Sequence, residues 1–388
     1  MVLSTRPPSS PRLPRPRPAT WSGRRRLLIA CLVILLIAPT VSYLRALLYP
    51  GQATVSVRTV EWLRDNGGSG AIDALENWWY TRHAPSGTAP DPASLPSAAA
   101  ADRPGSSGPA PVDLPAPLPT LAGVPPVPGE GRWAAGRVAP DGVPAMVTTF
   151  VRPDPAYPGV VAGVARFDQR RVRGRLIAGT REPDRQPWPE GGQVPPELRA
   201  GLVAAFNSGF KMAAAQGGFY ADGRYARPLR DGAASLVIDR DGRMSVAAWG
   251  RDARFGPDVA AVRQNLALIV DNGVADPGLG SNAGGRWGSA RNQLQYTWRS
   301  AIGTDPAGNL VYVGGNQLSL TALAHALTLA GVSRGMELDI HPRMVDLLGY
   351  HPGADGQPVP NPLLPTMPGP ATRYLDPDQR DFIAVTLR

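Results

Sequence analysis

Cysteine is almost absent from this chain of 388 residues, since Cys31 is the only one. A single cysteine forms no internal disulfide and builds no cysteine-based metal site, so disulfide scaffolds and zinc ribbons are excluded. The chain also lacks a Gly-x-Ser-x-Gly elbow, a nucleotide-binding glycine fingerprint and a recognisable cysteine nucleophile.

Acidic residues are missing from the N-terminal region, where the first one is Glu61. Seven arginines precede residue 27, so they supply seven of the formal nine positive charges and leave +2 for the remainder. That remainder has no basic stripe to follow a phosphate backbone. We therefore expect a basic tail over residues 1–26 and no nucleic-acid partner.

Charge is also absent from Leu27 to Leu44, a run of apolar residues directly after the arginines. Its length is just enough to cross a bilayer, and Leu47, Leu48 and Tyr49 extend it past Arg45. No clear small-x-small cleavage site follows, which favours an uncleaved anchor over a cleaved signal peptide. We expect a single-pass cell-membrane protein that contacts lipid through residues 27–49, with a cytoplasmic N-terminus and an extracytoplasmic C-terminal domain.

Three segments follow this run. Residues 51–83 contain two short amphipathic patterns around a glycine turn, which predict membrane-proximal helices. Their tryptophans could rest at the lipid interface or pack on the soluble domain, and the pattern does not choose between the two. Residues 84–128 are rich in proline, alanine and serine and predict a disordered spacer. Residues 129–388 form the predicted globular ectodomain.

Helix signals are few in the ectodomain, whereas strand-like runs recur throughout it. A hairpin is expected at 236–248, because Asp241-Gly242 suits a tight turn between two apolar runs. Helices are expected at Pro195–Ala205 and at Ser319–Ala330, the second capped by Ser319 or Thr321 and ended by Gly331. The predicted fold class is α+β, with a strand-dominated mixed sheet and few helices, behind one transmembrane helix and the disordered spacer.

The sequence Met-Glu-Leu-Asp-Ile-His at residues 336–341 alternates strictly between apolar and ionisable residues. On a strand this pattern puts Glu337, Asp339 and His341 on one face. Pro342 cannot donate to a sheet ladder, so the strand should end there and leave the three groups near a rim. A half-buried strand with a polar face explains the pattern equally well; a functional site is the alternative that the ionisable residue types favour.

A second candidate segment is glycine-rich. Phe206-Asn207-Ser208-Gly209-Phe210 is followed by Gly217-Gly218-Phe219. Asn207 offers a donor and an acceptor to a sugar hydroxyl or amide. Gly209 and Gly218 permit close approach of a ligand to the backbone. We therefore assign Asn207, Gly209 and Gly218 to substrate binding, although an asparagine in such a segment is also typical of an ordinary turn.

These segments, in this order, resemble the phosphodiester glycosidase domain family. The family pattern runs Asn-Gly-Gly-Phe, Arg-Thr-x-x-Gly, a threonine-leucine helix and Leu-Asp-Gly-Gly-Gly-Ser. The matching positions of this chain are Asn207, Gly209, Phe210, Arg299, Gly303, Leu320, Gly331, Leu338 and Asp339. Ser300 replaces the threonine, and Ile340-His341-Pro342-Arg343 replaces the glycine-serine run. The chain is most similar to an actinobacterial, membrane-anchored branch that lacks this run.

The resemblance implies hydrolysis of a sugar-1-phosphodiester in a cell-envelope glycan. Cleavage at an anomeric carbon needs a carboxylate pair, so Glu337 and Asp339 are the predicted catalytic residues. Alternate residues of one strand face lie about 6.5–7 Å apart, which leaves room for a water. Arg299 is the predicted phosphate clamp, because its planar fork matches phosphate oxygens. His341 is assigned to substrate binding beside them.

Two alternatives remain open at this point. Glu337, Asp339 and His341 could bind a divalent cation, with a further ligand from Asp271 or Asn207, although no metal or other cofactor is expected on the preferred interpretation. The second alternative is a catalytically silent ectodomain that binds envelope glycan or an assembly partner. The missing glycine-serine run favours the catalytically silent ectodomain, because the free backbone amides of such a run would bind a phosphate.

Overall fold

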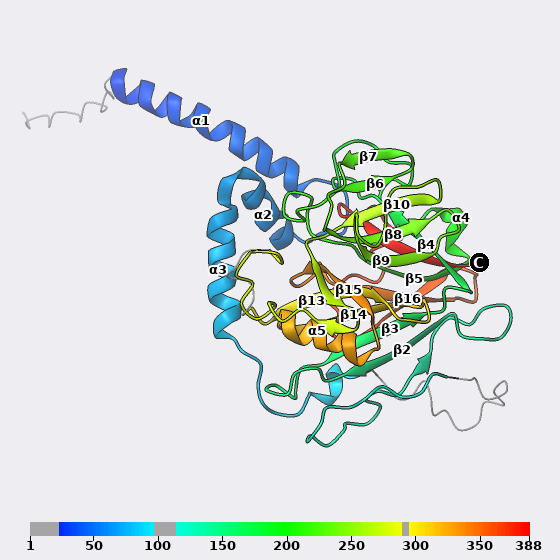
Figure 1. Cartoon of the computed structure of the whole chain (residues 1–388). Coiled ribbons are helices and arrows are strands. Elements are labelled where there is room, and N and C mark those ends of the chain that lie inside the picture. The colour runs from blue at the N-terminus through cyan, green and yellow to red at the C-terminus, as the bar shows by residue number, and fades with distance from the viewer. Residues whose placement is uncertain (1–22, 97–113, 289–294) are drawn as a thin grey trace, which may run out of the picture.

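The computed structural model describes residues 23–96, 114–288 and 295–388. Most of the predicted basic tail and the middle of the predicted spacer lie outside the described residues. Figure 1 shows a body of sheets with a long helix that projects away from it and two shorter helices along one side.

The N-terminal part is helical. Helix α1 spans Gly23–Leu47, α2 spans Val55–Leu63, a π-helical turn η1 spans Arg64–Gly68, and α3 spans Ser69–Arg82. Within the described residues, α1 is the one helix long and apolar enough to cross a membrane; its window Ala30–Leu47 has a mean hydropathy of 2.0. A membrane anchor and a signal sequence both satisfy this criterion. Gly67, with φ of +89°, allows the chain to turn between α2 and α3.

Three sheets make up the body, and their strand orders show that neighbours in space are often distant in sequence. The first has eight strands in the order β1 (Ala134–Ala135), β2 (Met146–Val151), β3 (Ala162–Phe167), β14 (Leu310–Leu318), β13 (Thr297–Thr304), β15 (Arg334–Ile340), β11 (Leu268–Asp271) and β12 (Val274–Ala275). The second has five in the order β7 (Arg224–Arg227), β6 (Phe219–Ala221), β10 (Val259–Gln264), β8 (Ala234–Asp239) and β9 (Met244–Ala248). The third has five in the order β17 (Pro358–Pro362), β16 (Leu347–Pro352), β5 (Leu202–Asn207), β18 (Phe382–Leu387) and β4 (Val172–Ile177).

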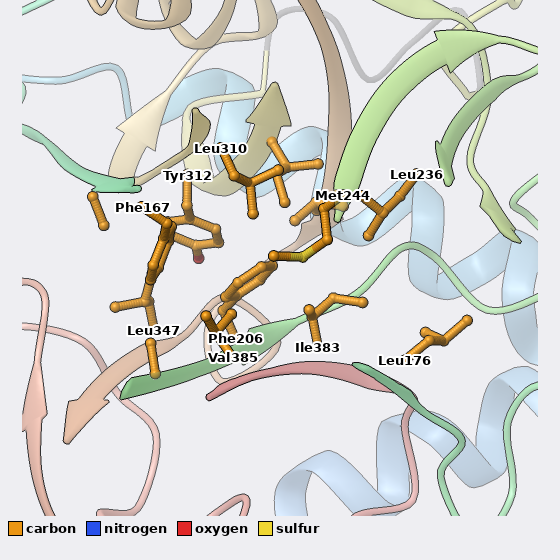
Figure 2. Close-up of a cluster of buried hydrophobic side chains, with 14 of the residues drawn as sticks. Phe167, Leu176, Phe206, Leu236, Met244, Leu310, Tyr312, Leu347, Ile383 and Val385 are labelled. Atoms are coloured by element: carbon orange, nitrogen blue, oxygen red, sulfur yellow. The ribbon is translucent and has the colours of Figure 1, made fainter. Parts of the chain in front are cut away.

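The main core lies where the three sheets face one another. Figure 2 shows Phe206 of the third sheet with Phe167 and Tyr312 of the first sheet on one side and Met244 of the second sheet on the other. The ring centroids of Phe206 and Tyr312 are 5.1 Å apart, and those of Phe206 and Phe167 are 6.1 Å apart. Burial of such aromatic side chains is the principal stabilising term, because apolar area leaves water.

Helix α5 (Leu320–Leu329) covers the other face of the eight-stranded sheet. The period-two alternation explains this second layer: Tyr312 points into the main core, whereas Val311 and Val313 pack under α5. Ser319 caps the helix by accepting a hydrogen bond from the Ala322 N–H at 3.1 Å, as predicted. Gly335 lets α5 approach, because a Cβ there would lie 2.6 Å from Leu327 Cδ1.

The structure confirms a strand-dominated α+β fold and corrects two details. The predicted helix at Pro195–Ala205 is only the short α4 (Pro196–Arg199), and the following residues form β5 in the middle of the third sheet. All described strand pairs are antiparallel, whereas a mixed sheet was expected. A short 3₁₀ turn, η2 (Pro92–Ser94), interrupts the spacer segment.

Candidate active site

Glu337 and Arg299 form a buried ion pair between neighbouring strands of the eight-stranded sheet. Arg299 Nη1 lies 2.6 Å from Glu337 Oε1, and both side chains are almost fully buried. The Arg299 guanidinium also donates to the carbonyl oxygens of Leu318 at 3.0 Å and Gln295 at 3.4 Å. Arg299 is therefore held by protein acceptors in this structure, and its predicted role as a phosphate clamp stays a prediction.

A β-bulge separates this pair from Asp339. Ala301 pairs with Glu337, but Arg299 pairs with Ile340, so β15 uses one more residue than β13 over this stretch. The Asp339 carboxylate instead pairs with Arg380, with Oδ2 2.7 Å from Nη2, while its Oδ1 accepts from the Ile340 N–H at 2.9 Å. Such a bulge re-aims side chains. The two predicted catalytic carboxylates thus face different arginines.

His341 does not continue the alternation, and the prediction that it shares the strand face is wrong. Strand β15 ends at Ile340, and His341 has φ of +80°, which turns the chain out of the strand. Its Nδ1 lies 3.3 Å from Thr297 Oγ1, and its ring stacks on Tyr80 of α3 with centroids 5.5 Å apart. Burial, together with Arg64 and Arg299, lowers the pKa of His341 to about 3, so the imidazole is neutral at pH 7.

Burial dominates the ionisation of both carboxylates. It raises the pKa of Glu337 to about 7, although Arg299 opposes the rise; the charge of Asp339 adds to it. Burial also raises the pKa of Asp339, against the lowering effects of Arg380 and the Ile340 N–H. Glu337 Oε2 is buried and accepts no hydrogen bond from the part of the chain that the structure describes. A carboxyl group that holds a proton near neutral pH suits general acid catalysis.

Glu337→Gln is expected to flatten the pH dependence of stability. The pKa of Glu337 is higher in the folded protein, about 7, than its ordinary value of 4.5. The folded state therefore binds more protons between these values, so the stabilisation is full below pH 4.5 and is lost as pH rises through about 7. Urea unfolding at several pH values should show a shallower slope for the variant in this window. An unchanged slope would contradict the assignment of the raised pKa to Glu337.

Asn207 is the centre of a buried hydrogen-bond network. Its Oδ1 accepts from the Tyr312 hydroxyl and from the Asp346 N–H, both at 3.0 Å. Its Nδ2 donates to Ser300 Oγ at 2.9 Å and to the Ser208 carbonyl at 3.1 Å. Ser300 Oγ in turn donates to the Asp339 carbonyl at 2.9 Å. Asn207 therefore connects the third sheet to the candidate strand, and its predicted contact with substrate stays a prediction.

Asn207→Ala is expected to reduce the free energy of unfolding by about 2–4 kcal/mol, because several buried polar groups lose a partner. Thermal or chemical unfolding measures this loss. Asn309→Ala is a suitable control, since Asn309 Nδ2 bonds only Asp305 in a partly buried turn, at 2.9 Å. If Asn207→Ala unfolds like the wild type, the network is not a stabilising element.

Gly209 and Gly218 both lie where the chain packs closely. A Cβ at Gly209 would approach the Asn265 side chain at 3.0 Å, and the Gly209 carbonyl accepts from Arg380 Nη2 at 3.2 Å. A Cβ at Gly218 would lie 2.2 Å from the Pro228 carbonyl. Both glycines thus have packing roles, and Gly209 also touches the arginine that holds Asp339. Their roles in substrate binding stay predictions.

The helix pair, residues 55–82, lies over this part of the body (Figure 1). Glu61 of α2 forms an ion pair with Lys211, and Asp65 of η1 lies 3.2 Å from the same Lys211 Nζ. Asp65 also pairs with Arg181 at 3.0 Å. On α3, Glu76 Oε2 lies 3.4 Å from His341 Nε2. The negative charge of Glu61 reaches the Asp339–Arg380 pair, since it raises the pKa of both groups.

The space beneath α2 is small. A cavity of about 60 Å³ lies between the helix and the body, lined among others by Glu61, Arg343, Arg373 and Arg380. Small-molecule sites usually measure about 300–1,000 Å³, so a sugar phosphodiester does not fit here while the helix pair is in place. A ligand of that size could reach Asp339 only after movement of the helix pair.

Sequence reasoning missed three residues of this region. Arg380 and Lys211 were not singled out, because their partners lie far away along the chain. Asp346 is also a buried carboxylate; burial raises its pKa to about 6, and neither of its oxygens accepts a hydrogen bond. Its nearest cation is Arg373, with Nη1 3.9 Å from Oδ2. The only available signal was its place shortly after the alternating strand.

A divalent-cation site does not form from the predicted ligands. Glu337 faces Arg299, Asp339 faces Arg380, and His341 faces Thr297 and α3. Over residues 23–96, 114–288 and 295–388, no group of three or more His, Cys, Asp or Glu side chains is arranged to hold a metal ion. The guanidinium groups occupy the positions that a cation would need.

Comparison with known proteins gives distant structural similarity only. No protein-family model matches the chain, and no curated protein matches it. Among solved structures, it is similar to the catalytic domain of zebrafish N-acetylglucosamine-1-phosphodiester alpha-N-acetylglucosaminidase auto-inhibited by its pro-peptide, with 13% identity, 65% of this chain and 86% of that chain covered, and a TM-score of 0.41. A hypothetical protein from Synechocystis is similar at 14% identity, with 63% of this chain and 62% of that chain covered and a TM-score of 0.36. These values do not transfer an activity to this chain.

Proposed function

We propose that this chain is an envelope-anchored glycan hydrolase that cleaves a sugar-1-phosphodiester. The observation that carries the proposal is the pair of buried carboxylates on β15, Glu337 and Asp339, each with a raised pKa and each held by its own arginine. Perturbed carboxylates of this kind concentrate at catalytic sites.

The two carboxyl groups have environments that suit different roles. Burial raises the pKa of Glu337 to about 7, so this group can hold a proton near neutral pH and serves as the acid, giving that proton to the leaving phosphate oxygen. Asp339, beside Arg380, is the group that stabilises positive charge at the anomeric carbon. A water oxygen bonds to that carbon as the carbon–oxygen bond to phosphate breaks; the water loses one proton to solvent, and the Glu337 carboxylate takes a proton back from solvent. The products are a free sugar and a phosphomonoester.

The phosphate would bind where the helix pair now places its own carboxylates. Lys211 and Arg181 are neutralised by Glu61 and Asp65, and Glu61 also lies near Arg380. Lys211 and Arg181 become available to an anionic phosphodiester when the helix pair leaves, whereas Arg380 keeps its ion pair with Asp339. Charge-assisted bonds from lysine and arginine are the usual means of phosphate recognition. The helix pair therefore imitates the charge of the substrate and keeps the site closed.

The proposed location of the protein at the cell envelope rests on α1. Its apolar window and the arginines before it favour a membrane anchor with the ectodomain outside the cytoplasm. The substrate is then a glycan of the cell envelope. Because α2 begins eight residues after α1 ends, the helix pair lies close to the membrane surface.

Glu61→Gln with Asp65→Asn is expected to raise kcat/KM for a sugar-1-phosphodiester, because it removes the charges that hold the helix pair on Lys211 and Arg181. The full-length chain in detergent is incubated with a panel of sugar-1-phosphate diesters, and released sugar is measured. Asp73→Asn is the control: it removes one carboxylate of α3 that pairs with Arg64, 3.7 Å away, within the helix pair itself. No sugar release by either the wild type or the double variant would refute the hydrolase.

A silent glycan-binding ectodomain is the second candidate. It is favoured by the way Arg299 and Asn207 are fully engaged with protein groups, so neither is free to contact a ligand in this conformation. The same panel decides between the two functions. Retained binding of envelope glycan without any turnover, in both the wild type and the double variant, would establish the binding module.

A further inference from the structure

A three-walled groove lies where α1 meets the ectodomain, and its lining residues differ from those of the small cavity at Arg380. Its volume is about 1,030 Å³. One wall is the last three turns of α1, a second is the end of α2 with η1, and the third is the loop from Thr180 to Arg185. We propose that this groove binds an anionic phospholipid of the membrane leaflet next to the ectodomain. The proposal rests on the membrane anchoring inferred above and on no catalytic step.

Side-chain contacts hold the first two walls together. The Trp62 indole N–H donates to Ser42 Oγ at 3.0 Å, and the Tyr43 and Trp62 rings meet edge to face with centroids 5.1 Å apart. Arg58 closes the junction by donating to the carbonyl oxygens at the end of α1, including Leu47 at 2.9 Å. Such a cation at a helix C-terminus satisfies carbonyl groups that have no partner in the helix.

The third wall is tied to the other two. The Tyr49 hydroxyl donates to the Thr180 carbonyl at 3.1 Å, and the Arg181 guanidinium lies over the Tyr49 ring at 5.3 Å. Arg181 also pairs with Asp65 of η1 at 3.0 Å. The groove is therefore formed by contacts among α1, the helix pair and the ectodomain, and its shape does not depend on a ligand.

The groove is apolar along α1 and basic at its outer end, which matches the acyl chain and the headgroup of a lipid. Ile37, Ala38 and Val41 supply the apolar wall on α1, and Arg45 lies one turn beyond Val41, at the outer end of the apolar window. From Ile37 to Arg45 the helix rises about 12 Å, so part of an acyl chain can lie on the apolar wall while the headgroup reaches the arginine.

The headgroup end carries unsatisfied positive charge. Arg45, Arg181 and Arg185 line the groove together with Asp65, which gives a net charge of +2. Arg45 and Arg185 are exposed, and within the described residues neither side chain has a hydrogen bond or an ion pair. Guanidinium groups bind phosphate oxygens in a bidentate manner, and basic residues beside a membrane helix attract anionic lipid. A lipid phosphodiester complements this charge.

The test uses the full-length chain in nanodiscs of phosphatidylcholine and phosphatidylglycerol in equal parts. Electron paramagnetic resonance of spin-labelled lipids gives the immobilised fraction of phosphatidylglycerol relative to phosphatidylcholine. We expect a preference for phosphatidylglycerol that falls about fivefold or more in Arg45→Gln with Arg185→Gln. The matched control is Arg227→Gln with Arg243→Gln, which removes the same charge from exposed arginines outside the groove. Its preference should equal that of the wild type.

Three results would overturn the proposal: an unchanged preference in the groove variant, an equal loss in the control variant, or displacement of the labelled lipid by inorganic phosphate at constant ionic strength. The last would make the groove a site for free anions. If the groove variant does not fold, Arg185→Gln alone, on an exposed loop, should still show a smaller loss. The readout is lipid binding, so a protein without hydrolase activity can pass the test, and an active hydrolase can fail it.

Discussion

Arg299→Leu is expected to destabilise the fold by about 3–5 kcal/mol at pH 7 or above. The variant leaves Glu337 buried without its partner, and it also removes the donors to the Leu318 and Gln295 carbonyls. Because protonation removes the negative charge of Glu337, the loss in the free energy of unfolding should become smaller as the pH falls towards 5. Chemical unfolding at several pH values measures both effects.

The double variant Arg299→Leu with Glu337→Leu supplies the control. Replacing both members of a buried ion pair with apolar residues is often close to neutral, so most of the lost stability should return and its pH dependence should disappear. Arg170→Leu breaks an exposed pair with Asp168 and should leave the free energy of unfolding nearly unchanged. If the double variant is no more stable than Arg299→Leu, the backbone acceptors, and not the ion pair, determine the role of Arg299.

Asp339→Asn is expected to lower kcat/KM for a sugar-1-phosphodiester by about 10²–10⁴-fold. The amide keeps the shape of the side chain and its acceptor for the Ile340 N–H, but it loses the negative charge that would stabilise an oxocarbenium-like transition state. The effect should lie mainly in kcat, because the charge develops only as the bond breaks. Initial rates on the full-length chain measure it.

Asp305→Asn is the matched control for this substitution. Asp305 is a mostly buried carboxylate that pairs with Arg166 at 2.9 Å in the turn between β13 and β14. Its replacement should leave kcat/KM within about twofold of the wild type, since its ion partner is Arg166 and not a group of the candidate site. Equal activity of the wild type and Asp339→Asn would remove Asp339 from the catalytic mechanism, whatever reaction the protein performs.

Local patterns predicted much of the body of this protein. Alternating apolar residues identified the strand through Leu338 and the hairpin around Asp241-Gly242, because period two is the geometry of a strand itself. The cap at Ser319 was also predictable, since it depends on residues only three apart. Periodicity gave the wrong prediction at Leu202–Asn207, because a short apolar run is compatible with both a helix and a strand. Pairing with β16 and β18 in the third sheet determines that this segment is a strand.

The candidate site was less predictable, because long-range contacts form it. Asp339 was visible from its strand, but its partner Arg380 lies just before the last strand, β18, and Arg263 pairs with Asp381 across 118 residues. The bulge between Glu337 and Ile340 depends on the pairing with β13, so no local pattern revealed that the two carboxylates face different arginines. The covering helix pair was predicted as helical but not as a neighbour of Lys211.

Lys211 is the only lysine in the chain, whose other cationic side chains are arginines and histidines. Apart from the N-terminal amine, the protein therefore has a single primary amine, and that amine lies against Glu61 and Asp65. An ion-paired and partly covered ammonium is a poor nucleophile towards amine-directed acylating reagents. The chain thus contains its own one-site chemical reporter, whose acylation rate records how often the helix pair leaves the body.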